Sequence, residues 1–155
     1  MILMRAALLL LALMCAQASA TAGPSVRQLV ILSDEPVKVL ACLPIETGSP
    51  FYLEFINSIY LAPVRETLVY TETDGALITR VESPSAGVFE YYGLEPDSSG
   101  SAELHRSVGK IRIRSFNYEN HRLTAGGKTI YLKDIVSGGQ PVIVEIWKNG
   151  TYCGH

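Results

Sequence analysis

Neither positive nor negative charge predominates in this chain. Residues that commonly build metal or catalytic centres are also few. Thirteen Lys and Arg stand against fifteen Asp and Glu among 155 residues, which gives a formal net charge of −2. That balance argues against a nucleic-acid partner, which usually leaves a basic surface. The histidines His105, His121 and His155 are scattered, and the sequence has neither a glycine-rich phosphate loop nor a nucleophile elbow. We therefore expect no metal, no cofactor and no catalytic activity.

Long apolar runs are missing after the first twenty residues. The segment Met1–Arg5 supplies one positive charge, residues 6–14 form a short apolar run, and Ala18-Ser19-Ala20 provides the small residues that a signal peptidase reads. This run is too short to span a bilayer. We expect residues 1–20 to be a cleaved signal peptide and residues 21–155 to be one domain, periplasmic or secreted, with no stable membrane span after cleavage. Lipidation at Cys15 is the alternative, although Met14 fits poorly before a lipidated cysteine.

Cysteine is also rare, and cleavage would leave only two of the three residues. These are Cys42 and Cys153, which an oxidising compartment would tend to pair. A bridge between them would close most of the chain into one loop. The alternative is two unpaired thiols, because spacing alone does not establish the geometry that a disulfide requires.

A helical period is absent as well, apart from one possible turn at residues 133–136. Short runs rich in β-branched and aromatic residues follow one another instead, separated by clusters of Gly, Pro, Asp and Ser. This pattern predicts an all-β, single-domain antiparallel β-sandwich or partly closed β-barrel, with little or no helix in the mature chain. The expected strands cover about residues 27–33, 37–43, 51–59, 64–70, 76–82, 103–116, 129–132 and 142–148.

The segment 51–70 predicts a hairpin with two polar residues on its apolar face. If residues 60–63 form the loop, Ile59 lies opposite Val64 and Asn57 lies opposite Glu66. Side chains alternate between the two faces of a strand, so this pair would sit on the core face. A carboxylate there needs a partner, and the Asn57 amide is the first one expected. The pair is either a polar binding pocket or a structural bond that sets strand register.

Several further residues are candidates for a binding site. An arginine from Arg106, Arg112 or Arg114 is expected to complete the polar site around Glu66. Lys110, Arg112 and Arg114 alternate with isoleucines, and this basic row could receive an organic anion or be an ordinary solvated face. Glu145 could pair with the row if the strands are neighbours. Tyr91 and Tyr92 form either a ligand-stacking or docking patch or part of the core.

A set of short motifs follows one order along residues 29–147: Gly48, Phe51, Asn57-Ser58-Ile59, Pro63-Val64, Glu66, Ala86-Gly87 and residues 123–132. In the order and spacing of these motifs the mature chain resembles an exported bacterial family catalogued as domain of unknown function 1850 (DUF1850). The family's His-Ser-aliphatic triplet is replaced here by Asn57-Ser58-Ile59, so the resemblance does not imply proton transfer or metal binding at this position.

The resemblance implies a role beside membrane transport. Members of that family typically occur next to tripartite TRAP-type (TAXI) transporters, which import small organic anions. The function expected from the resemblance is a non-catalytic accessory or interaction protein, with a periplasmic transporter subunit or solute-binding protein as partner. The alternative is a binding protein for a small organic anion that uses the pocket at Asn57 and Glu66.

Overall fold

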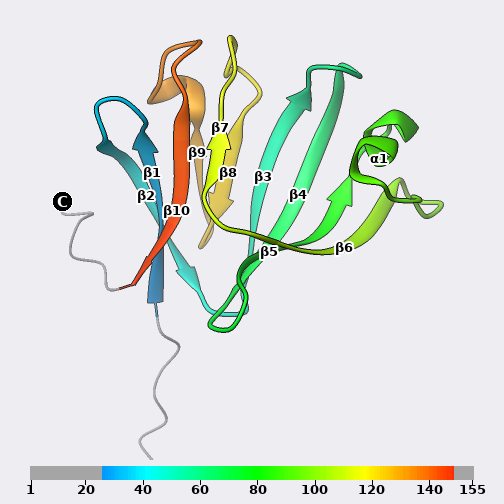
Figure 1. Cartoon of the computed structure of the whole chain (residues 1–155), viewed down its shortest axis with the longest axis horizontal. Coiled ribbons are helices and arrows are strands. Elements are labelled where there is room, and N and C mark those ends of the chain that lie inside the picture. The colour runs from blue at the N-terminus through cyan, green and yellow to red at the C-terminus, as the bar shows by residue number, and fades with distance from the viewer. Residues whose placement is uncertain (1–25, 149–155) are drawn as a thin grey trace, which may run out of the picture.

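The computed structural model describes residues 26–148, and it consists mostly of antiparallel strands in two sheets (Figure 1). This confirms the predicted all-β fold, and the arrangement is sandwich-like. The four-stranded sheet has the order β2 (Lys38–Glu46), β1 (Val26–Ser33), β10 (Val142–Lys148) and β7 (Ile111–Ile113). The six-stranded sheet has the order β6 (Ser101–Val108), β5 (Gly75–Glu82), β4 (Ala62–Thr71), β3 (Pro50–Asn57), β8 (Arg122–Ala125) and β9 (Lys128–Tyr131).

The core lies between the sheets, and strand β4 shows how the sequence places it there. Every second side chain from Ala62 to Tyr70 is buried, while the residues between them are exposed or half-buried. This alternation is expected of a strand with one face on the core and one on solvent. The largest fully buried side chains in the core are Phe51, Phe89, Leu29, Ile31, Leu43, Leu68, Leu123 and Leu132.

The segment 103–116, which the sequence leaves open as a long strand or a broken pair, is a broken pair. Strand β6 is the edge of the six-stranded sheet and β7 is the edge of the four-stranded sheet. Gly109 and Lys110 join them, so the chain passes from one sheet to the other at this point. One sheet edge is thereby tied to the other on the side of the molecule that holds the candidate site.

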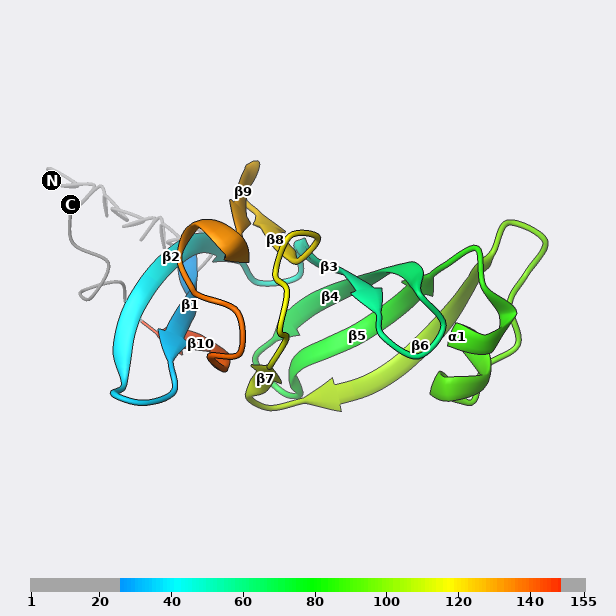
Figure 2. The same ribbon diagram turned by 90° about the horizontal axis from the view of Figure 1, so that it is seen from above.

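Two short helices accompany the strands. Helix α1 (Ala86–Tyr92) lies at the far end of the six-stranded sheet from β1 and β2 (Figure 2), and η1 (Leu132–Asp134) is a single 3-10 turn. Helix α1 buries Val88, Phe89 and Tyr92, and it ends at Gly93 in the left-handed conformation, with φ of 70°. Glycine adopts that conformation without steric cost, which makes it the usual residue after a helix.

The predicted pairing of β3 with β4 is wrong in register, although the division into two faces is right. Leu53, not Asn57, lies opposite Glu66, and Phe55 lies opposite Val64. The turn therefore begins at Ser58, two residues earlier than predicted. The observed register differs from the predicted one by an even number of residues, so Asn57 and Glu66 remain on the core face. They are nevertheless not opposite each other, so the predicted pocket built on an Asn57–Glu66 pair does not form.

Cys42 lies on β2, opposite Val30 of β1. It is disulfide-bonded. Its predicted partner Cys153 lies outside the described residues, as does Cys15, and the pairing of Cys42 with Cys153 therefore stays a prediction. The predicted signal peptide also falls outside the described residues.

The β3–β4 turn contains an unusual backbone conformation at Leu61. It is the one residue other than glycine with positive φ among residues 26–148, at 51°. A branched apolar side chain is disfavoured there, because its Cβ approaches the following carbonyl oxygen. Leu61 is also 79% exposed, so burial of the side chain does not offset this strain.

We expect Leu61→Asn to raise the free energy of unfolding by about 1 kcal/mol, because Asn tolerates the left-handed region better than Leu. Urea unfolding measures the change. Ile59→Asn is the matched control, since Ile59 is exposed in the same turn without a positive φ, and it should change stability little. An equal gain from both substitutions would attribute the effect to polarity and not to the backbone.

Candidate binding site between the two sheets

A cavity of about 520 Å³ lies between the inner face of the six-stranded sheet and strand β7. Apolar side chains make up somewhat more than half of its walls, and polar side chains line it from β3, β4, α1, β6, β7 and the segment that follows β7. The apolar lining comes from Leu53, Phe55, Ile78, Val108, Ile111 and Ile113. The charged and polar lining includes Glu66, Tyr92, Arg106, Arg112, Arg114 and His121.

Glu66 is the one acid among the described residues that line this cavity, and it is 8% exposed. Its Oε1 accepts a short hydrogen bond from the Tyr92 hydroxyl. Burial raises the pKa of the Glu66 carboxyl, and the bond from Tyr92 and the charge of Arg106 offset only part of that rise. The predicted partner of Glu66 was Asn57, and the observed partner is Tyr92 on a different element.

Arg106 is the arginine that completes the site, out of the three predicted. It lies on β6 opposite Ile78, and its Nη2 donates to the Tyr92 carbonyl oxygen at 3.2 Å. Its charge also acts on the Glu66 carboxyl, whose pKa it lowers against the effect of burial. The cavity wall therefore carries an acid and a cation that are bonded to the two ends of Tyr92, and no ion pair joins them.

Tyr91 and Tyr92 have different roles, although they are neighbours in sequence. Tyr92 is buried and bonds to Glu66, whereas Tyr91 is exposed at the cavity mouth. Their rings meet edge to face with centroids 5.6 Å apart. Burial and the nearby Glu66 charge raise the pKa of Tyr92 far above its ordinary range. Tyr92 is consequently a neutral hydrogen-bond donor at physiological pH.

Asn57 and Ser58 form part of the turn at the mouth. The Asn57 Oδ1 accepts from the backbone N–H groups of Ile59 at 2.9 Å and Tyr60 at 3.1 Å. This is the local bonding by which asparagine stabilises a tight turn. Ser58 is exposed and also lines the cavity. The motif resemblance at these residues thus falls on a turn that borders the cavity.

Gly87 holds this turn against helix α1. A Cβ at Gly87 would lie 2.3 Å from the Tyr60 ring, much closer than side chains approach. Only glycine lets the ring lie directly on the first turn of the helix without movement. The Ala86-Gly87 step and the turn after β3, which the resemblance matches separately, are therefore in contact.

The predicted basic row is divided among three environments. The Lys110 Nζ lies 2.7 Å from the Glu145 carboxylate, which confirms the expected pairing with β10. Arg112 forms an ion pair with Asp34 in the β1–β2 turn. Arg114 is exposed at the cavity mouth and has no ion pair with any residue in the described part of the chain. It is the member of the row with charge available to a ligand.

His121 was not proposed as a site residue from the sequence, yet it lines the cavity and is nine-tenths buried. It stacks on Phe55, with centroids 6.1 Å apart, and meets Tyr118 edge to face at 5.3 Å. Burial lowers its pKa, which favours the neutral imidazole. The signal was present in the sequence, because His121 shares the alternating core positions of Leu123 and Ala125.

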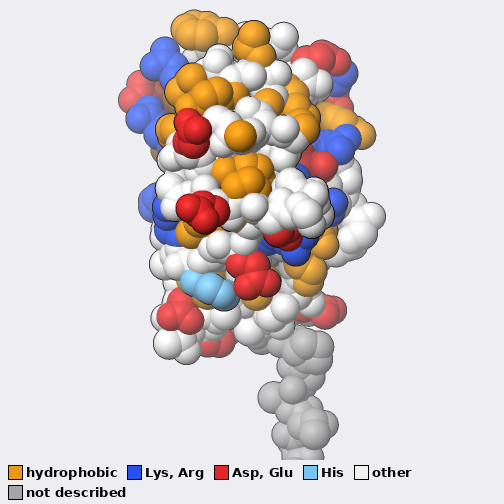
Figure 3. Space-filling view, turned by 90° about the vertical axis from the view of Figure 1, so that its right-hand side faces the viewer, with side chains coloured by type: hydrophobic (Ala, Val, Ile, Leu, Met, Phe, Trp, Pro, Cys, Tyr) orange, Lys and Arg blue, Asp and Glu red, His pale blue; other side chains and the backbone are white. Residues whose placement is uncertain are grey.

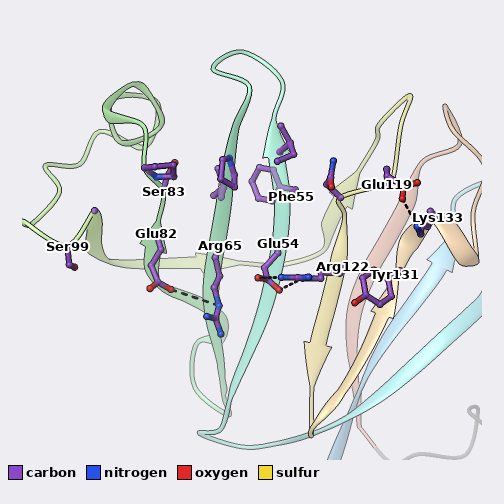
Figure 4. Close-up of a pocket in the computed structure, with 16 residues that line it drawn as sticks. Glu54, Phe55, Arg65, Glu82, Ser83, Ser99, Glu119, Arg122, Tyr131 and Lys133 are labelled. Carbon is purple, nitrogen blue, oxygen red and sulfur yellow. Dashed lines mark hydrogen bonds and ion pairs between the residues drawn. The ribbon is translucent and has the colours of Figure 1, made fainter.

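A second hollow of about 640 Å³ lies on the opposite, outer face of the six-stranded sheet (Figure 4). Alternating charges cross this face from strand to strand. Glu54 lies opposite both Arg65 and Arg122 and accepts two bonds from Arg122, at 2.6 and 2.8 Å. Arg65 reaches Glu82 at 4.0 Å, and Lys133 pairs with Glu119. The cations of this hollow are paired within the protein, so the inner cavity is the better candidate.

Comparison with known proteins adds no assignment. No family model, no curated protein and no solved structure matches this chain. The resemblance to DUF1850 therefore remains a prediction. Between residues 26 and 148, neither helix has the length and hydrophobicity needed to cross a bilayer. Over the same residues, no three His, Cys, Asp or Glu side chains are grouped so that they could hold a metal ion.

We expect Glu66→Gln and Glu54→Gln to shift the pH dependence of stability in opposite directions. Burial raises the Glu66 pKa, so the contribution of Glu66 is complete below its ordinary value of 4.5 and is lost as pH rises through the raised folded pKa. The hydrogen bond from Arg122 lowers the Glu54 pKa, so its contribution is present above 4.5 and is lost as pH falls through the lowered folded pKa.

The measurement is urea unfolding of the wild type and both variants from pH 3 to pH 7. Relative to the wild type, Glu66→Gln should gain stability with rising pH, and Glu54→Gln should lose it. The two residues lie on opposite faces of the same strand pair, which makes each a control for the other. Loss of stability by Glu66→Gln as pH rises would mean that the fold favours the ionised form.

Proposed function

We propose that this protein is an exported, non-catalytic domain that binds a small organic anion between its two sheets. One observation carries the proposal, namely the convergence of Arg106 and Glu66 on an open cavity with apolar walls. A closely packed acid–amide pair would have favoured a purely structural role. The volume of about 520 Å³ falls within the range typical of small-molecule sites, about 300–1,000 Å³.

The walls suit a ligand with an apolar body. Leu53, Phe55, Ile78 and Val108 face the cavity from adjacent strands, and Ile111 and Ile113 face it from β7. Each methylene group removed from water contributes about 0.8 kcal/mol, so a chain of several methylenes is needed to offset the entropy lost on binding. The arginines at the edge then suit an acidic head group.

The exposed apolar residues gather at one end of the molecule, and this distribution supports binding at that end. The β1–β2 turn, the β3–β4 turn and the β7–β8 connection lie at the upper end in Figure 1, and they contain the exposed residues Val37, Ile59, Leu61 and Phe116. Figure 3 shows hydrophobic side chains at this end as well. The turns at the opposite end, residues 47–49, 72–74, 109–110 and 126–127, contain no large apolar residue. Ile59 and Tyr91 also line the cavity, and exposed apolar side chains at its edge fit a surface that receives a largely apolar ligand.

The chemistry of the cavity favours binding over catalysis. Tyr92 remains a neutral donor, and its hydroxyl is bonded to Glu66. The proton on Tyr92 is thus held in place and is not available for transfer to a substrate at neutral pH. Ser58 has no hydrogen-bonded base in the part of the chain that the structure describes. These groups can recognise a ligand by charge and hydrogen bonding.

The accessory role beside a TRAP-type transporter, with a transporter subunit or solute-binding protein as partner, stays a prediction of the family resemblance. It is compatible with the proposed binding, because such transporters import small organic anions.

The proposal is tested by titrating the protein with octanoate in a calorimeter at low ionic strength. We expect the wild type to bind octanoate and Arg106→Gln to bind it at least tenfold more weakly, since the acidic head loses its cation. Arg80→Gln is the matched control, because Arg80 lies on the adjacent strand β5 and pairs with Glu82 of the outer hollow. Absence of octanoate binding, or equal weakening by both variants, would contradict the proposal.

A further inference from the structure

The His121 side chain is a buried polar group to which the fold gives no hydrogen bond. It is 9% exposed, and its Nδ1 is fully enclosed without a partner among residues 26–148. Nε2 forms no hydrogen bond in that range either, but it is not enclosed. His121 lines the inner cavity, so Nε2 faces the cavity. Most buried side-chain polar atoms in proteins are hydrogen-bonded, and this histidine is an exception.

The His121 ring is held in one position even though neither of its nitrogens is bonded. The His121 backbone N–H donates to the Tyr118 carbonyl at 3.0 Å, and its carbonyl accepts from the Leu132 N–H at 2.9 Å. The ring stacks on Phe55 and meets the Tyr118 ring edge to face. Tyr118 is fixed in turn, because its hydroxyl donates to the Gln140 carbonyl at 2.6 Å. A polar group that is rigidly held and keeps its bonding capacity is preorganised for a ligand.

The two nitrogens of the ring are not equivalent, and this decides what Nε2 offers. In a neutral imidazole one nitrogen carries a proton and donates, and the other accepts. A proton on Nδ1 of His121 would be a donor sealed away from any acceptor, and orphaned buried donors are rarer in proteins than under-satisfied acceptors. A proton on Nε2 can reach an acceptor inside the cavity. Since burial also lowers the His121 pKa and favours the neutral ring, His121 presents an N–H donor to the cavity.

His121 lies across the cavity from Arg106. It directly precedes β8, whereas Arg106 lies on β6, and β5, β4 and β3 stand between these two strands in the sheet. Neighbouring strands are about 4.8 Å apart, so roughly 19 Å of sheet separates the two backbones. The Arg106 guanidinium bonds to the Tyr92 carbonyl of α1, which holds it on the helix side. One carboxylate group therefore cannot contact both residues.

We propose that His121 is a specificity-determining residue of the cavity, whose Nε2–H donates to a ligand oxygen remote from the acidic group. This inference rests on the proposed function and defines the ligand class further, as an acid with an apolar body and a second oxygen acceptor. The carboxylate binds Arg106, the body lies against Leu53, Phe55 and Ile78, and the second oxygen accepts from His121. A plain alkyl carboxylate leaves this donor unpaired, and a site that bonds a polar group discriminates against an analogue without it.

The test compares octanoate with 5-oxo-, 6-oxo- and 7-oxooctanoate by calorimetry at pH 7, in the wild type and in His121→Phe. The phenylalanine keeps the stacking on Phe55 and removes both nitrogens. For at least one oxo acid, the ratio of its affinity to that of octanoate should fall roughly fivefold or more in His121→Phe, because one buried hydrogen bond is lost. Using the ratio removes the cost of dehydrating the ketone, which is the same in both proteins.

Two further variants separate recognition from packing. His105→Phe is the matched control, since His105 is an exposed histidine of β6 that does not line the cavity, and it should leave every ratio unchanged. His121→Gln can place an amide N–H near the position of Nε2 and should restore part of the preference for the oxo acid. A ratio that falls equally in His105→Phe and His121→Phe would overturn the inference.

Nitrogen-15 NMR of histidine-labelled wild-type protein tests the same inference without a variant. We expect the neutral His121 ring to carry its proton on Nε2 at pH 7, and the Nε2 resonance to shift when the preferred oxo acid is added. A proton on Nδ1 would overturn the inference, because Nε2 would then accept and not donate. This measurement applies even if His121→Phe does not fold.

The outcomes distinguish failure of this inference from failure of the proposed function. Octanoate binding that depends on Arg106, with affinity ratios unchanged in His121→Phe, would overturn the inference and leave anion binding intact. Binding of neither octanoate nor any oxo acid by the wild type would contradict both.

Discussion

The hydrogen bond between Tyr92 and Glu66 is the contact on which the candidate site depends. It joins helix α1 to the middle of the six-stranded sheet across 26 positions of sequence. A carboxylate on the core face of β4 would be costly without a hydrogen-bond donor. In the described part of the chain, its one donor is the Tyr92 hydroxyl on the helix. The helix also supplies the carbonyl that positions Arg106. The acid, the donor and the cation therefore form one connected group.

The two faces of the β3–β4 pair show how the same residue types acquire different roles. On the outer face, Glu54 is bonded to Arg122, and its pKa is lowered. On the inner face, Glu66 meets a neutral donor in an apolar cavity, and its pKa is raised. The charged side chains of the outer face form ion pairs with one another across the strands, which stabilises the exposed sheet modestly. Charged side chains are fewer on the inner face, and they retain hydrogen-bonding groups that a ligand can use.

Sequence reasoning predicted the fold class and the faces of the strands, because alternation is a local property. It failed in register because the turn after β3 begins at Ser58, where Asn57 bonds two backbone N–H groups. Ala62 and Pro63, the last two residues of the expected loop, lie instead inside β4. Helix α1 was missed since seven residues are too few to display a helical period. The partner of Glu66 lies on that helix, so the error in secondary structure hid the partner as well.

The cavity exists because the inner face of the six-stranded sheet has two different covers. Helix α1 packs Val88 and Phe89 onto one end of it, and the four-stranded sheet covers the side near β3 and β8. Strand β7 is only three residues long, so it continues the second cover only briefly before the chain turns away. Glu66 and Arg106 lie between the two covers, where close packing is interrupted. The short edge strand β7 thus leaves the buried acid beside a cavity that Ile111 and Ile113 of this strand line.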